Sequence, residues 1–222
     1  MSSSISLNPM QTTTAAGLFS TNSNGFTQGD ALDDPAIKFQ LVGGVLALDA
    51  ATPVWGGVPI SEKIGPSPAG GSPPYGAQYK SLGNTVYPAD AGANNITGYC
   101  VFNQAYGGIT TPQSTAPLYS PGMSVNYYRL NSGARIPLPV DPALLTLEGS
   151  AITPTINQLS WDFAAGRLVA LDPTLGSAGV TILYFSTANN LTVAYDGMAG
   201  TANWVTGNPI AVCLLAQMTN FT

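Results

Sequence analysis

Short apolar runs separated by turn residues extend along most of the chain. In residues 39–62 the apolar run stops at Asp49 and resumes at Val54. Runs this short, rich in Val, Ile, Leu and Trp, predict two strands joined by a loop. The pairs Gly43-Gly44 and Gly56-Gly57 interrupt them, which is typical of bulges and bends. We therefore expect a bent, apolar hairpin that a second sheet or another subunit covers.

The same pattern predicts strands over residues 84–88, 97–103, 107–111, 125–130, 134–140, 156–163, 166–171, 180–186, 191–195 and 210–218. The clearest hairpin joins 125–130 to 134–140 through Asn131-Ser132-Gly133, because glycine readily adopts the positive φ of a tight turn. The Pro-rich residues 59–79 are expected to form a surface loop. Many short strands with turn signals between them predict an all-β fold, either a sandwich or a jelly-roll-like barrel of short antiparallel strands.

One short helix is expected within residues 141–149. Asp141 can cap it, Pro142 suits the first helical position, and Gly149 follows its end.

Residues 1–30 have a different composition from the rest of the chain. They are mostly Ser, Thr, Asn and Gly, with isolated apolar residues such as Phe19 and Phe26. Such a segment cannot bury enough apolar surface to fold alone. It is either an unstructured terminus or an extended arm that becomes ordered on a partner, and we favour the arm. The expected organisation is an N-terminal arm over 1–30 and a β-sandwich or barrel domain over 31–222.

Composition limits the classes of partner. Charged residues make up 8% of the chain and hydrophobic residues 45%, whereas about a quarter of a typical domain is charged. A free monomer with so few charges would be poorly solvated, so we expect neighbouring subunits to cover much of its surface. The net charge of −5 and six scattered basic residues argue against a nucleic-acid partner.

The sequence also argues against a membrane location or export. It contains no run near the ~20 apolar residues of a transmembrane helix. The N-terminus lacks the basic and apolar regions of a signal peptide. We expect a soluble protein made in a cytoplasm.

Catalytic chemistry finds little support. The chain has no histidine, which removes the commonest general base and the Ser-His and Cys-His pairs. No Gly-rich phosphate loop precedes a helix. Asp162 with Glu148 or Asp172 could form a hydrolytic carboxylate pair, but any β protein with eleven acidic residues offers such pairs. We expect no enzymatic activity and no cofactor.

No metal site is expected either. Asp30, Asp33 and Asp34 precede Pro35, a spacing that fits no calcium loop. Cys100 and Cys213 lie in apolar runs without a CxxC or Cys/His cluster, which predicts two buried, reduced thiols.

Several residues are candidates for an interface with a partner. Arg129 and Arg135 flank the 131–133 turn, and Tyr127 and Tyr128 precede it. Arginine and tyrosine are enriched where proteins meet, although each arginine could instead pair with one carboxylate. Trp55, Trp161 and Trp204 could stack on sugars, but burial or an interface is the commoner use of tryptophan. The interface candidates are Phe19, Phe26, Trp55, Tyr127, Tyr128, Arg129 and Arg135.

Four blocks carry a resemblance to a known family. They are DALDDPAIKFQLVGGVLALDAATPVWGGVPISE, TGYCVFNQAYGGITTPQS, GMSVNYYRLNSGARIPLPV and NQLSWDF. In this order, and from about Gly29 to Cys213, the chain resembles the cement (decoration, head-stabilising) proteins of tailed-phage capsids.

The resemblance implies a non-enzymatic structural protein on the outer capsid surface of a virion. Its implied partners are the major capsid protein and further copies of itself, with a homotrimer favoured and a dimer possible. The alternative is a carbohydrate-binding adhesin or tail-fibre module of the same virion.

Overall fold

The computed structural model describes residues 25–26, 37, 39–63, 84–92, 95–102, 118–150, 154, 158–196 and 198–215, with backbone alone at 25–26, 186–194, 201–202, 204 and 206–208. The elements are β1 (Gly25–Phe26), β2 (Val42–Leu46), β3 (Pro59–Lys63), β4 (Thr85–Pro88), β5 (Gly98–Val101), β6 (Ser124–Arg129), β7 (Arg135–Pro139), η1 (Pro142–Leu147), β8 (Leu159–Asp162), β9 (Arg167–Ala170), β10 (Val180–Asp196) and β11 (Thr201–Leu215).

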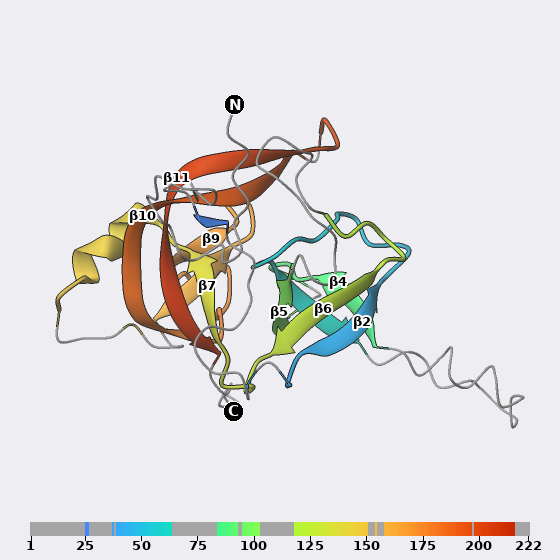
Figure 1. Cartoon of the computed structure of the whole chain (residues 1–222), viewed down its shortest axis with the longest axis horizontal. Coiled ribbons are helices and arrows are strands. Elements are labelled where there is room, and N and C mark those ends of the chain that lie inside the picture. The colour runs from blue at the N-terminus through green and yellow to red at the C-terminus, as the bar shows by residue number, and fades with distance from the viewer. Residues whose placement is uncertain are drawn as a thin grey trace, which may run out of the picture.

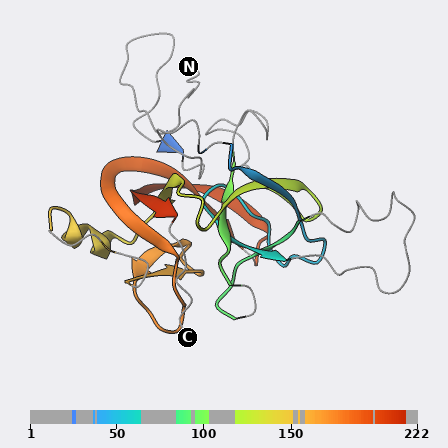
Figure 2. The ribbon, with the colours of Figure 1, turned by 90° about the horizontal axis from the view of Figure 1, so that it is seen from below.

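The strands form three sheets, which confirms the expected all-β class. Five strands close a barrel in the order β2-β4-β3-β5-β6. A four-stranded sheet has the order β1-β10-β11-β7, and β8 pairs with β9. The barrel lies beside the four-stranded sheet in two perpendicular views (Figures 1 and 2). We expected antiparallel strands, and two pairings differ from that expectation. β2 pairs with β4, and β1 with β10, in parallel.

The first expected hairpin does not form. β2 and β3 lie on opposite sides of β4 and do not pair with each other. The connection between β2 and β3 is instead hydrogen-bonded to the segment before β6. Val54 and Tyr119 exchange two backbone hydrogen bonds of 3.1 and 2.8 Å. β3 also occupies the first five residues of the expected 59–79 loop.

The 131–133 turn has the expected geometry but a different role. Asn131 and Gly133 have φ of 77° and 70°. The strands on either side do not form a hairpin, because β2 and β5 occupy both edges of β6 and β7 pairs with β11. The turn therefore leads the chain from the barrel into the four-stranded sheet.

Alternating side chains place two cores on the two faces of the barrel wall. Cys100 and Tyr127 point into the barrel, where they pack with residues such as Leu46. Tyr99 and Tyr128, their neighbours in sequence, point outward and join a second cluster with β7–β11. Because successive strand residues face opposite sides, β5 and β6 contribute to both cores at once.

The remaining elements follow the sequence in part, since β11 begins at Thr201, nine residues before the expected strand at 210–218. The short helix is confirmed as the 3₁₀ helix η1, where the Asp141 side chain accepts a hydrogen bond of 2.8 Å from the Ala143 N–H. The expected strands 180–186 and 191–195 are one strand, β10, with irregular register between Ser186 and Thr192. The expected strand 107–111 and all of the arm except β1 lie outside the described residues.

Candidate functional site

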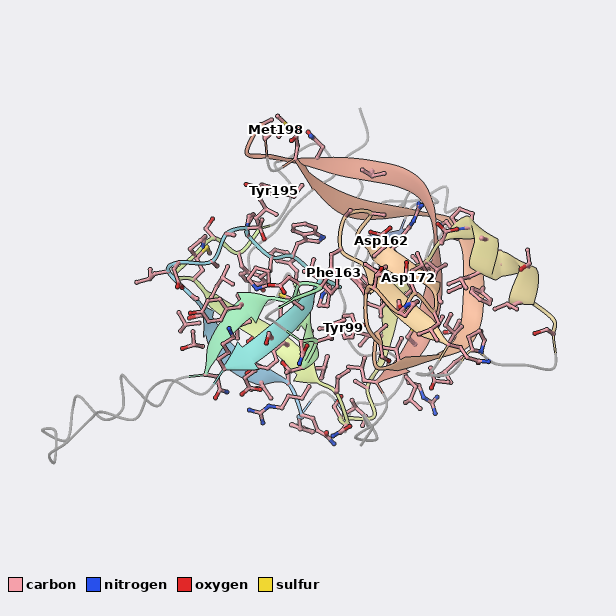
Figure 3. The ribbon with its side chains drawn as sticks, turned by 180° about the vertical axis from the view of Figure 1, so that it is seen from behind. Tyr99, Asp162, Phe163, Asp172, Tyr195 and Met198 are labelled. Carbon is pink, nitrogen blue, oxygen red and sulfur yellow. The ribbon has the colours of Figure 1, made fainter. Side chains whose placement is uncertain are left out.

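A cleft of about 250 Å³ lies where the barrel meets the rest of the molecule. Four aromatic rings line it, from Trp55, Trp161, Phe163 and Tyr195, together with four prolines, Pro53, Pro59, Pro88 and Pro139. The rings come from both halves of the chain. Phe163 and Tyr195 can be seen between the barrel and the β8–β11 region in Figure 3.

The barrel side of the cleft is the connection between β2 and β3. Trp55 is half-buried there, and its carbonyl accepts a hydrogen bond of 3.2 Å from the Val58 N–H. Gly57 adopts a φ of 84°, a conformation that glycine adopts without a steric penalty. Its N–H donates to the Cys100 carbonyl at 2.8 Å, which fixes the loop against β5.

The opposite side is built by the β8–β9 hairpin. Trp161 is buried in β8, with its ring edge-on to Tyr99 at 5.7 Å between centroids. Phe163 begins the turn after β8. The Asp162 carboxylate accepts hydrogen bonds from the N–H groups of Ala164 and Ala165, which holds that turn and hence the Phe163 ring.

Tyr195 contributes from the far end of β10. It pairs with Ala202 in the β10–β11 hairpin. Its ring lies 6.4 Å from that of Trp55, at a tilt of 44°. This contact joins the hairpin to the barrel across the cleft.

The cleft is suited to neutral, apolar groups. Among the described residues that line it there is no Asp, Glu, Lys or Arg, and Thr52 is the only non-aromatic polar side chain. Such a lining can stack on and desolvate a ligand, but it provides no general base and no cation ligand. The described residues also contain no group of three or more His, Cys, Asp or Glu that could hold a metal ion.

A second surface feature lies on the barrel. Val45, Leu48 and Met123 are 44%, 86% and 47% exposed. The Leu46 N–H donates to the Met123 carbonyl at 2.9 Å, and Leu48 lies against Gly122. These three exposed residues therefore lie in neighbouring backbone segments at one end of the barrel, and we call them the β2–β6 patch.

Two of the sequence-predicted interface residues are core residues instead. Tyr127 and Tyr128 have no exposed surface, so neither side chain can contact a partner, and that expectation is wrong for both. Burial raises the pKa of Tyr127 to about 12. The Tyr-Tyr pair spans the barrel wall, with one ring in each core.

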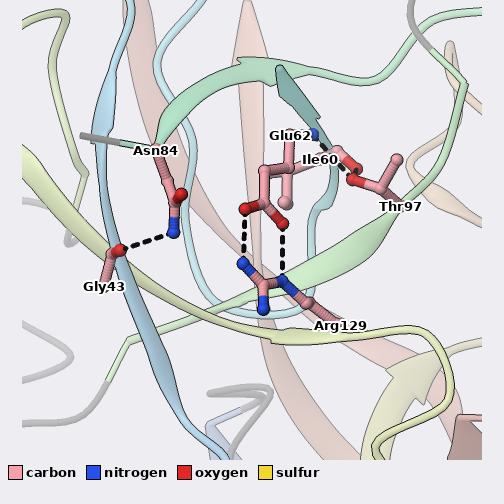
Figure 4. A network of polar contacts seen from close by, with 6 residues as sticks. All are labelled: Gly43, Ile60, Glu62, Asn84, Thr97 and Arg129. Atoms are coloured by element: carbon pink, nitrogen blue, oxygen red, sulfur yellow. Dashed lines mark hydrogen bonds and ion pairs between the residues drawn. The ribbon is translucent and has the colours of Figure 1, made fainter. Parts of the chain in front are cut away.

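Arg129 is a structural residue of the barrel surface. Its Nε and Nη2 donate to the Glu62 carboxylate at 2.7 and 2.6 Å (Figure 4). The Glu62 N–H donates to Thr97 Oγ1 at 2.6 Å, so the pair is tied to the β3–β5 side of the barrel. The hydrogen bond from Arg129 lowers the pKa of Glu62. Arg167 forms a single-point ion pair with Asp141, with Nη2 2.8 Å from Oδ2.

The other candidates are placed as follows. Trp55 lines the cleft, and Arg135 is exposed on β7, an edge strand of its sheet. Phe26 lies in β1, of which only the backbone is described, and Phe19 lies outside the described residues.

Two of the three nominated carboxylates, Asp162 and Asp172, hold local turns. Asp162 binds the backbone of the β8–β9 turn, as above. The Asp172 carboxylate accepts hydrogen bonds of 2.6 and 2.8 Å from Thr174, and these bonds lower the pKa of Asp172.

Sequence reasoning missed most of the cleft. The Trp161-Asp162-Phe163 run gave a local signal, because two large rings spaced two residues apart fall on the same face of a strand and need a partner to cover them. Tyr195 gave none, because its partner Trp55 is 140 residues away in sequence.

Comparison with known proteins adds no family. The chain matches no protein-family model, no curated protein and no solved structure. In the described part of the chain, no helix is both long and apolar enough to cross a membrane.

Proposed function

We propose that this chain is a non-enzymatic cement protein of a phage virion. It binds the outer surface of the head and stabilises the lattice of major capsid protein by bridging its subunits. The observation that carries the proposal is the β2–β6 patch, three large apolar side chains exposed together on a chain with only 8% charged residues. The resemblance of four sequence blocks to the capsid cement proteins supports the same assignment.

The patch has the properties of a contact surface. Burial of exposed apolar side chains against a partner is favourable, by roughly 25 cal/mol per Å² of apolar area removed from water. Other exposed apolar side chains, including Phe39 and Met198, offer further contacts. We propose a homotrimer, with a dimer as the alternative, and Arg135 as a polar contact at the margin.

Stabilisation of the particle follows from mass action. A ligand that binds only the assembled lattice stabilises it by the free energy of that binding. Because the capsid repeats the site many times, a modest affinity at each site yields a persistent coat.

A carbohydrate-binding adhesin or tail-fibre module is the second candidate. The four rings of the cleft favour it, because sugars stack on aromatic faces. The lining lacks the convergent polar side chains that orient a sugar, since Thr52 is the only non-aromatic polar side chain among its described residues. We therefore place this function second.

Add-back to particles that lack the protein tests the proposal. Wild-type protein should cosediment with the particles, and Leu48→Asp should weaken attachment by about tenfold or more, because a charge in an apolar contact is costly to desolvate. Leu171→Asp is the matched control, since it places the same charge on an exposed leucine of the other half. Equal attachment of all three proteins would exclude the patch as the contact. Wild-type binding to host glycans but not to particles would favour the adhesin.

A further inference from the structure

The aromatic cleft has a chemistry that selects its occupant. Its rings and prolines form an uncharged wall, and its volume of about 250 Å³ is just below the ~300–1,000 Å³ of small-molecule sites. Aromatic-lined grooves of this kind accept extended proline-containing chain, which loses little conformational entropy on binding. A neutral, proline-rich peptide segment is therefore the best match.

The chain itself carries such a segment. Residues 65–75 read GPSPAGGSPPY, with four prolines and a tyrosine, and no charged residue occurs from Ile64 to Tyr79. These residues lie between Lys63, the end of β3, and Asn84, which precedes β4. They are outside the described part of the structure.

The segment and the cleft are at opposite ends of the same strand pair. Lys63 pairs with Thr85 at the end where the segment leaves the barrel. The cleft is lined by Pro59 and Pro88 at the other end. Four residues of strand separate the two ends, about 14 Å at ~3.4 Å per residue. β3 thus ends at Lys63, on the side of the strand pair opposite the cleft.

We infer that the cleft receives the proline-rich stretch of residues 65–75 from a second copy of the chain. The contact is head-to-tail, and a head-to-tail contact that closes gives a ring. This inference rests on the proposed homo-oligomer and specifies the contact between its subunits. Trp55 and Tyr195 of one copy contact the prolines of the next.

Two complementary variants test the inference in solution, without capsids. The segment variant carries Pro66→Ser, Pro68→Ser, Pro73→Ser and Pro74→Ser. The cleft variant is Tyr195→Asp, which places a charge beside the apolar lining. Its matched control is Asn203→Asp, which adds the same charge at an exposed position of the same hairpin.

Light scattering should show an oligomer for the wild type and for Asn203→Asp, and a monomer for each of the two variants alone. Mixing the two variants should give a 1:1 complex that grows no further, because each mixture has one intact cleft and one intact segment. A synthetic peptide of residues 64–79 should bind the segment variant, measured by calorimetry. The cleft variant should bind the peptide at least about tenfold more weakly than the segment variant does.

Other results would overturn the inference. If both variants remain oligomeric, the subunits meet elsewhere. If variants and mixture are all monomeric while the peptide binds only the segment variant, the segment occupies its own cleft. Hexose binding that Tyr195→Asp abolishes, with no peptide binding, assigns the cleft to sugars. Should Tyr195→Asp lower the melting temperature, Tyr195→Ser replaces it with the same expectations. Attachment to capsids is measured separately, so failure here leaves the cement function to its own test.

Discussion

At the scale of single residues, the Glu62–Arg129 pair links two strands of the barrel that do not pair directly. β5 lies between β3, which carries Glu62, and β6, which carries Arg129. The two-point contact is well oriented, but the Arg129 side chain is 50% exposed. Solvent therefore screens the pair, and its contribution to stability is about 1 kcal/mol or less.

The pair predicts a pH dependence of stability. The folded-state pKa of Glu62 lies below its ordinary value of 4.5, because Arg129 donates to its carboxylate. A depressed folded-state pKa adds stability above the unfolded pKa, and this is lost as pH falls through the folded pKa. Glu62→Gln should thus lower the free energy of unfolding by up to about 1 kcal/mol at pH 7 and by progressively less below pH 4.5.

Urea unfolding of wild type and variant across this pH range measures the difference. Glu148→Gln, which removes an exposed carboxylate after η1, is the control for the loss of one negative charge. A Glu62→Gln difference that is constant with pH would contradict the assignment of the ion pair.

The two cysteines predict a second residue-level result. Cys100 and Cys213 are free and fully buried, and burial raises the pKa of both thiols. Protonated, inaccessible thiols react slowly, so thiol reagents should label the protein only after denaturant is added. Reductant should leave the melting temperature unchanged. A clear decrease in melting temperature with reductant would instead indicate a disulfide.

Composition predicted the burial of the thiols but not that of the tyrosines. Cys100 and Cys213 lie in apolar runs, and the structure confirms that both are buried. Tyr127 and Tyr128 looked like interface residues because arginine follows them. In the structure, the side chains of β6 alternate between its two faces, so one tyrosine ring enters each core. The burial of both rings could be predicted only by knowing that each face of β6 is covered by a core.

At the scale of elements, β5 depends on a glycine that lets strands approach closely. A Cβ on Gly98 would clash with the Tyr128 carbonyl oxygen, a backbone atom that cannot move without shifting β6. Gly98→Ala should therefore lower the free energy of unfolding by about 2 kcal/mol. Chemical denaturation measures the change.

Gly43→Ala is the matched control in the same barrel. Its nearest neighbour would be Asn126 Oδ1 at 3.9 Å, so it should change stability by no more than about 0.5 kcal/mol. Equal effects of the two substitutions would show that the close approach at Gly98 is not a determinant of barrel stability.

Most strand positions were predictable from the sequence, although β1 and the first nine residues of β11 were missed. Strand partners were not predictable. The turn at residues 131–133 and the positive φ of Gly133 were correctly anticipated, whereas the positive φ of Asn131 was not. The pairing of β6 was not, because two more distant strands compete for its edges and local residues do not encode that competition. The cleft was missed for the same reason: its rings meet only through long-range packing.

At the scale of the whole molecule, the barrel and the four-stranded sheet share one of the two cores. The Tyr99 hydroxyl donates to the Ala178 carbonyl at 2.7 Å, from the barrel wall to the segment before β10. The outer face of β5 and β6 is thereby covered within the chain. The β2–β6 patch, on another part of the barrel, is not covered by the described residues of the chain. In the proposed function, this patch contacts the capsid.

The thermal rupture temperature of particles with and without this protein tests the central claim most directly. Particles lacking it should assemble with normal geometry and rupture at a lower temperature, and added wild-type protein should restore the higher value. Leu48→Asp should restore it poorly. If particles with and without the protein rupture at the same temperature but those without it no longer adsorb to cells, the cement function is contradicted and the adhesin takes its place.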